Sequence, residues 1–98
     1  MAYSNKPKKI GKVIDDFVES YPYKKELKRG MILSRFPIVV GKLMAGQVQE
    51  MYFKGGKLIV HVSNPGWRHE LHSQRYRIRK KLNESVKDDV VEEIRVLS

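Results

Sequence analysis

The sequence contains no cysteine, and this absence excludes several kinds of chemistry at once. Without thiols the chain has no disulfide framework, no thiolate zinc site and no cysteine nucleophile. No apolar run approaches the roughly 20 residues that a transmembrane helix needs. The first twelve residues are polar and basic and lack the apolar region of a signal peptide. We therefore expect a cytoplasmic protein that is not embedded in a membrane.

Motifs for catalysis and cofactor binding are also missing. The sequence has no GxGxxG loop, no Walker sequence and no HExxH, and its serines lie outside any nucleophile-elbow context. His69 and His72 are three residues apart, with His61 elsewhere, but their cationic surroundings disfavour a metal ion. We therefore expect no catalytic residues, no metal, no cofactor and no small-molecule substrate, which is the profile of a protein that is not an enzyme.

Acidic residues are scarce compared with basic ones. The chain has 11 Asp and Glu against 20 Lys and Arg, which gives a formal net charge of +9. The basic residues fall in three blocks, at 1–12, 24–29 and 68–81, whereas the residues after Asn83 are mostly acidic. A small domain with this balance favours a polyanionic partner.

Apolar spacing predicts one α+β domain at 10–98, preceded by a flexible basic arm at 1–9. Helices are expected from residue 10 to about Tyr21-Pro22, at 24–36 and at 65–83, and strands at 48–53, 58–62 and 90–97. The stretch after Pro37 fits either a restarted helix or a strand. The order is then α-α-β-β-α-β, with the helices on one face of a three-stranded sheet. The expected structural core comprises Phe36, Val40, Gly41, Trp67, Leu71, Ile78 and Leu82.

The helix expected at 65–83 carries a basic stripe beside its apolar stripe. On a helical wheel Arg68, Arg75, Arg79 and His72 share one side, and Tyr76 and Lys80 extend it. Arginines in a row can contact successive phosphates, and a neighbouring tyrosine can stack on a base. The candidate nucleic-acid-binding residues are Lys6, Lys8, Lys9, Lys12, Lys24, Lys25, Lys28, Arg29, Arg68, Arg75, Tyr76, Arg79 and Lys80.

Two segments, FPIVVGKLMA at 36–45 and GKLIVHVSNPGWRHEL at 56–71, with Leu82-Asn83 and Ile94-Arg95 after them, resemble the DciA family of bacteria. The resemblance implies a KH-like fold, nucleic-acid binding and an interaction with the replicative helicase DnaB, which such proteins help to place on DNA. Phe36 stands where the family usually has tryptophan, and the long tail of many members is missing. No GxxG is present, so any nucleic-acid contacts would come from basic side chains, with weak sequence specificity and strong salt dependence.

The leading hypothesis is therefore a DNA-binding protein that assists loading or operation of the replicative helicase. DNA is favoured over RNA, but two alternatives remain. One is an RNA-binding KH-like module linked to translation or ribosomes, and the other is a protein-interaction domain whose basic face meets an acidic protein. The sequence does not distinguish single from double strands.

Overall fold

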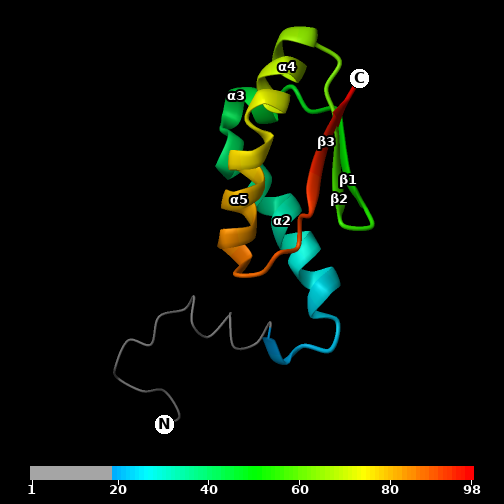
Figure 1. Cartoon of the computed structure of the whole chain (residues 1–98), viewed down its shortest axis with the longest axis vertical. Coiled ribbons are helices and arrows are strands. Elements are labelled where there is room, and N and C mark those ends of the chain that lie inside the picture. Colours follow the sequence, from blue (N-terminus) through cyan, green and yellow to red (C-terminus); the bar gives the residue numbers. More distant parts are fainter. Residues whose placement is uncertain (1–18) are drawn as a thin grey trace, which may run out of the picture.

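Residues 19–98, which the computed structural model describes, form two layers, with helices against one face of a three-stranded sheet (Figure 1). The α+β class and the expected order of elements are confirmed, although the last helical segment is divided in two. The arm at 1–9 and residues 10–18 of the first expected helix lie outside the described residues, and Glu19 and Ser20, just before its expected end near Tyr21-Pro22, are helical. The elements are α2 (Lys24–Val40), α3 (Lys42–Ala45), β1 (Glu50–Lys54), β2 (Lys57–His61), α4 (Pro65–Ser73), α5 (Arg75–Val86) and β3 (Glu93–Leu97).

Strand β2 lies at the centre of the sheet, antiparallel to β1 and parallel to β3. Parallel neighbours need a crossover connection, and α4 and α5 together provide it. Leu58 and Val60 of β2 share one face of the sheet, and Leu58 pairs in register with Ile94. The side chains of Leu58, Val60 and Ile94 are buried beneath the helices, so this face forms the floor of the core. Ile59, on the opposite face, is also buried, at 4% exposure.

The hairpin between β1 and β2 turns at Gly55 and Gly56 as expected. Lys54 pairs with Lys57, so only the two glycines form the loop. Gly55 has a φ of +64°, a conformation that favours glycine at the first central position of a tight hairpin turn.

Helix α2 continues through Pro37 to Val40, beyond the end expected near residue 36. Pro37 is exposed and stands in the last turn, where loss of its N–H costs a single backbone hydrogen bond. Gly41 ends the helix with a φ of +92°, and its N–H donates to the Pro37 carbonyl. The stretch at 38–40 is therefore helical and not a strand.

The prediction of one continuous helix at 65–83 is wrong, because the helix is interrupted at Gln74, between α4 and α5. Helix α4 begins where expected: Asn64 Oδ1 accepts from the Trp67 N–H at 3.0 Å, and Pro65 occupies the first turn. At its end the Ser73 hydroxyl donates to the Glu70 carbonyl at 2.8 Å, a local bond that competes with regular helix.

Helix α5 ends in a left-handed residue, Lys87, with a φ of 55°. The Asp88 N–H bonds back to the Asn83 carbonyl, as in a Schellman motif. The Asn83 side chain, only 6% exposed, then makes two hydrogen bonds to the backbone of Val91: Nδ2 donates to the carbonyl at 2.9 Å and Oδ1 accepts from the N–H at 2.8 Å. These bonds fasten the segment before β3 to α5.

The core lies between α2, α4, α5 and the sheet. Among the residues expected there, Phe36, Leu71, Ile78 and Leu82 are each at most 1% exposed. Val40, Gly41 and Trp67 lie nearer the surface, beside a cleft between α3 and α4. Within residues 19–98 no helix is long and apolar enough to cross a membrane.

Lys28 is the one buried cation among the described residues, with 2% of its surface exposed. Its Nζ donates to Glu19 Oε1 at 2.7 Å and to Asp88 Oδ2 at 3.2 Å. The hydrogen bond to Glu19 raises the pKa of Lys28 above its usual value, against the opposing effect of burial. The bonds from Lys28 and Lys24 lower the pKa of Glu19. Lys28 thus links the residues before α2 to the segment after α5.

Replacing Asn83 with alanine should destabilise the fold, because both polar groups of the buried Val91 backbone lose their partner. We expect the free energy of unfolding to fall by about 2–4 kcal/mol. Urea denaturation followed by circular dichroism measures the change. Glu84→Ala, at the exposed neighbouring position, should change it by less than about 0.5 kcal/mol. A similar small change for Asn83→Ala would show that the two bonds contribute little.

Removing both carboxylates around Lys28, with Glu19→Gln and Asp88→Asn, should lower the Tm because a buried ammonium is left without a counter-charge. Adding Lys28→Met to this variant should recover most of the loss. A double variant as stable as the parent would refute the role assigned to Lys28.

The lowered pKa of Glu19 also predicts that the parent loses stability as the pH falls below about 4.5, through the folded-state pKa of this carboxyl.

Candidate nucleic-acid interface

The outward side of α5 carries most of the exposed cations of the predicted third basic block. Ile78, Leu82, Asn83 and Val86 are buried and thereby fix the rotation of the helix about its axis. The residues that remain exposed on its outer side include three cations, one aromatic ring and one carboxylate, that of Glu84. We call this surface the α5 cationic face, and it consists of Tyr76, Arg77, Lys80 and Lys81.

Arg75 extends this face through its contact with Tyr76. The guanidinium carbon lies 4.6 Å from the centre of the Tyr76 ring, and Nη1 donates to the His72 carbonyl at 2.8 Å. The arginine is thus held in place while the tyrosine remains 67% exposed. A fixed cation beside an exposed ring suits the contact of one phosphate and the stacking of one base.

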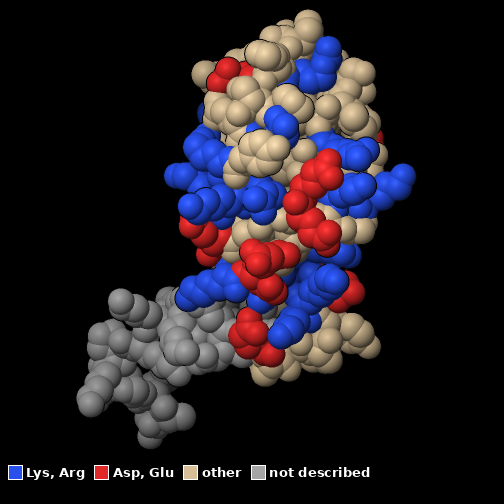
Figure 2. Space-filling view, in the orientation of Figure 1, with Lys and Arg blue, Asp and Glu red and all other residues tan. Residues whose placement is uncertain are grey.

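Acidic residues border the α5 cationic face on the side toward β3. Arg75, Tyr76 and Arg79 share a small hollow with Glu92 and Glu93. A second hollow, nearer the end of α5, brings Arg79 and Lys80 close to three carboxylates, those of Glu84, Asp88 and Asp89. Figure 2 shows the blue and red side chains side by side in this region.

No ion pair within 4 Å joins these carboxylates to the cations of α5 in the part of the chain that the structure describes. The cations therefore remain available to an external anion. The neighbouring carboxylates nevertheless weaken the positive potential on the β3 side. The favourable direction of approach is from the outer side of α5, away from Glu92 and Glu93, and the one carboxylate on that side of α5 is Glu84, about one turn from Lys80 and Lys81.

Arg68 lies apart from the other residues of the predicted stripe. Its Nη1 donates at 3.0 Å to the carbonyls of both Val62 and Ser63, so it stabilises the turn between β2 and α4. The break at Gln74 also separates it and His72 from the residues of α5. The predicted row from Arg68 to Arg79 is therefore not one continuous row, because a helical wheel holds only within one helix.

The second basic block, at 24–29, is largely engaged within the molecule. Lys28 is buried, and Lys24 forms an ion pair with Glu19 at 3.3 Å. Arg29 donates to the Gly55 carbonyl at 2.9 Å, and its guanidinium lies 5.5 Å from the centre of the Phe53 ring. Lys25 is exposed. Lys6, Lys8, Lys9 and Lys12 lie outside the described residues.

Arg77 and Lys81 were not among the predicted binding residues, yet both are exposed on α5. On a helical wheel Arg75 lies directly beside Leu82, at the border of the expected apolar stripe. Burial of Asn83 and Val86 turns α5 so that its buried side takes in Arg75 and Arg79, which are half-buried. Only the apolar position of Val86, beyond the expected helix end, could have signalled this rotation.

The histidines do not converge on a metal site. His61 contacts Tyr52, whose hydroxyl lies 3.2 Å from His61 Nε2, and its Nδ1 lies 3.2 Å from the Ser98 carbonyl oxygen. Over residues 19–98 the structure contains no group of three or more potential metal ligands.

Comparison with known proteins identifies a family for nearly the whole chain. Residues 9–96 match the family described as "Dna[CI] antecedent, DciA". No curated protein and no solved structure gives a significant match. The match covers α2, α3, both helices of the crossover, β1, β2 and all of β3 except its last residue. The chain therefore belongs to the DciA family, as its sequence motifs indicated.

Proposed function

We propose that this protein binds DNA through the α5 cationic face while it assists loading or operation of the replicative helicase in the cytoplasm. Membership in the DciA family implies a loader-like role with the helicase DnaB in DNA replication. The family is described by this role and not by an enzymatic activity. Beyond this family role, we propose that this chain binds DNA and that the residues of the α5 cationic face make the contacts.

The observation that carries the DNA-binding proposal is the set of three exposed cations on one short helix. Arg77, Lys80 and Lys81 lie within little more than one helical turn and form no ion pair with any described carboxylate. Arg77 makes only a neutral hydrogen bond, to the side-chain oxygen of Gln74. A phosphate can therefore approach without first breaking a salt bridge.

The chemistry of this face favours contact with the phosphate backbone over reading of the bases. Lysine is a flexible point charge that carries no base preference by itself. Tyr76 offers stacking, which every base accepts. Affinity is therefore expected to depend little on sequence, which suits a protein that acts wherever a helicase must be placed on DNA.

The charge reversal Lys80→Glu with Lys81→Glu should weaken binding of a fluorescein-labelled single-stranded oligonucleotide at least tenfold at low salt. Lys54→Glu with Lys57→Glu, at the exposed ends of the hairpin strands, changes the net charge equally and should alter the Kd less than threefold. Fluorescence polarisation measures both. Equal losses would indicate a response to net charge alone, and no loss in either would refute the interface.

Affinity should fall steeply as salt rises, because bound phosphates release counterions. If Arg75, Arg77, Lys80 and Lys81 engage about four phosphates of a single strand, log K against log salt should have a slope of about −3. The variant with both lysines reversed should show a visibly shallower slope.

Competition with duplex DNA and structured RNA in the same titration tests the preference for DNA, and stronger binding to RNA would favour the RNA-binding alternative.

A further inference from the structure

Strand β1 lies at an open edge of the sheet. Its one neighbour is β2, so no strand of the described residues pairs with its outer side. An edge strand presents unpaired backbone N–H and C=O groups to any strand that approaches it. Strand β1 contains no proline, and its register with β2 is unbroken from Glu50 to Lys54. The strand therefore has the backbone geometry that a further strand needs for pairing.

The two ends of β1 carry opposite charges. Glu50 begins the strand and Lys54 ends it, and both side chains are exposed. Within residues 19–98 neither of them forms an ion pair. Four residues of extended chain separate them by about 13 Å, which is too far for them to pair with each other. Both charges therefore remain available to an external partner.

The residues between these charges divide into two faces. Met51 pairs with Val60 and Phe53 pairs with Leu58, so both side chains lie on the helix side of the sheet. They are only half-buried there, unlike their fully buried partners on β2. Tyr52 lies on the opposite face and is 36% exposed. Burial of the apolar side chains of β1 is therefore incomplete in the isolated chain.

A second copy of β1 matches this strand at every position when the two run antiparallel with Tyr52 opposite Tyr52. Glu50 of each copy then lies opposite Lys54 of the other, so both free charges are paired at both ends of the contact. Met51 meets Phe53 on the helix side, and the two tyrosines meet on the open face. A shift by two residues, the smallest that keeps the faces aligned, removes both ion pairs.

The backbone pattern agrees with this register. Lys54 and Lys57 flank the two-residue turn and form its closing pair. Because the direction of N–H and C=O alternates along an antiparallel strand, Met51 and Phe53 direct these groups toward the open edge. With Tyr52 opposite Tyr52, these two residues lie opposite each other, so each can exchange backbone hydrogen bonds with the other copy.

The other edge of the sheet, β3, does not offer the same match. Its acidic residue Glu93 already pairs with Arg95 of the same strand at 3.0 Å. Its helix-facing Ile94 is 3% exposed beneath α4 and α5. Because α5 packs over β3, at the far edge from β1, pairing through β1 leaves the α5 cationic face of each copy exposed.

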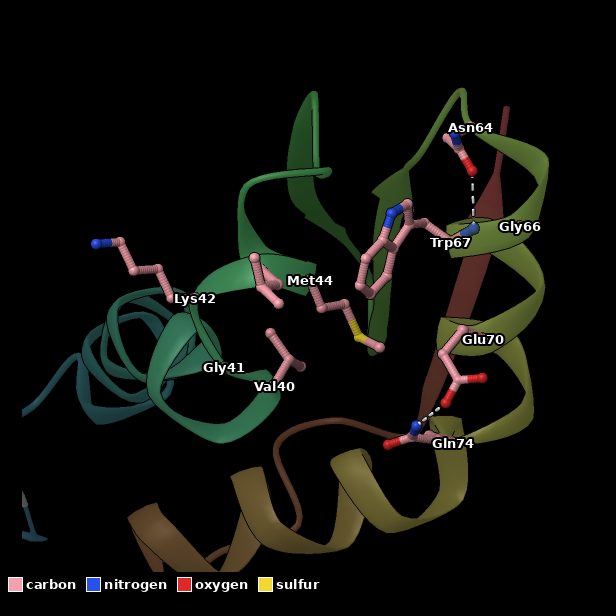
Figure 3. A pocket seen from close by; sticks show the side chains of 10 residues that line it. Val40, Gly41, Lys42, Met44, Asn64, Gly66, Trp67, Glu70 and Gln74 are labelled. Carbon is pink, nitrogen blue, oxygen red and sulfur yellow. Dashed lines mark hydrogen bonds between the residues drawn. The ribbon is translucent and has the colours of Figure 1, made fainter.

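The cleft of about 720 Å³ beside Trp67 does not identify a partner in this way (Figure 3). Its walls carry one unpaired charge of each sign, Lys42 on α3 and Glu70 on α4. Figure 3 shows Lys42 extending away from the opening, and the Glu70 carboxylate bonds only to the neutral amide of Gln74. These charges select neither an acidic nor a basic occupant, whereas those of β1 specify the order of charges in the partner strand.

We propose that this protein associates with a second copy of itself through antiparallel pairing of β1. The contact is isologous, with a two-fold axis through the Tyr52 pair, and it joins the two three-stranded sheets into one continuous sheet. Each copy contributes a strand of five residues, so the dimer is weak and forms at high protein concentration. Self-association through β1 goes beyond the proposed function and does not depend on DNA.

Sedimentation velocity of the purified chain without nucleic acid tests the association. From about 10 μM to about 1 mM protein, the average mass should rise from that of a monomer toward that of a dimer. A chain that remains monomeric over the whole range would overturn the proposal.

A charge exchange tests the register. Glu50→Lys and Lys54→Glu, made singly, each place like charges opposite one another at both ends of the contact and should raise the dimer Kd at least tenfold. The two substitutions in one chain restore opposite charges and should return the Kd to within threefold of the parent value. Glu93→Lys on β3 is the matched control and should change the Kd less than threefold. Thermal melting followed by circular dichroism verifies that each variant is folded.

The remaining outcomes separate this contact from other surfaces. A parent that dimerises while both single variants dimerise equally well uses another surface, and a combined variant as weak as the single ones contradicts the register; either result overturns the proposal. Equal weakening by Glu93→Lys would show that net charge controls the association and would also overturn it. The reversal of Lys80 and Lys81 should leave the dimer intact, so DNA binding and self-association can fail independently.

Discussion

The orientation of α5 against the core determines which of its side chains are exposed at the surface. Ile78, Leu82 and Val86 hold one side of the helix, and the two hydrogen bonds from Asn83 to Val91 tie it to the segment before β3. Because a buried amide with both bonds satisfied tolerates little rotation, the helix has one orientation. Its outer side then carries Tyr76, Arg77, Lys80 and Lys81, and the positive surface of the domain follows from a polar contact in its interior.

A net charge of +9 overstates the positive surface that the described residues offer. Three of the cations make contacts within the fold: Lys28 pairs with two carboxylates, Arg29 lies over an aromatic ring, and Arg68 donates to two backbone carbonyls. Lys28 and Arg29 connect α2 to segments that are distant in the sequence, and Arg68 connects α4 to the turn before it. Basic residues in a small domain thus serve stability as well as binding, and a count of lysines and arginines does not separate the two uses.

The cations of α5 and the cleft beside Trp67 belong to different parts of the crossover between β2 and β3. The break at Gln74 contributes to this separation, since α5 carries the cations while α4 forms one wall of the apolar cleft. Gln74 lies between them and connects Glu70 to Arg77 through its side-chain amide. The two crossover helices therefore present different chemistry at the surface, with cations on α5 and one wall of the cleft on α4.

The sequence by itself determined the parts of this protein whose signals are local. Two adjacent glycines specify the hairpin turn, Asn64 and Pro65 specify the start of α4, and the segments around Phe36 and Trp67 identify the family. The break after Ser73, the rotation of α5, the engagement of Arg68 and the cleft beside Trp67 were decided only by the tertiary structure. No glycine or proline marks the break, and the side of α5 that is buried depends on Val91, eight residues beyond Asn83 in the chain. Local propensities act over a few residues, whereas these features arise where distant segments compete for the same buried space.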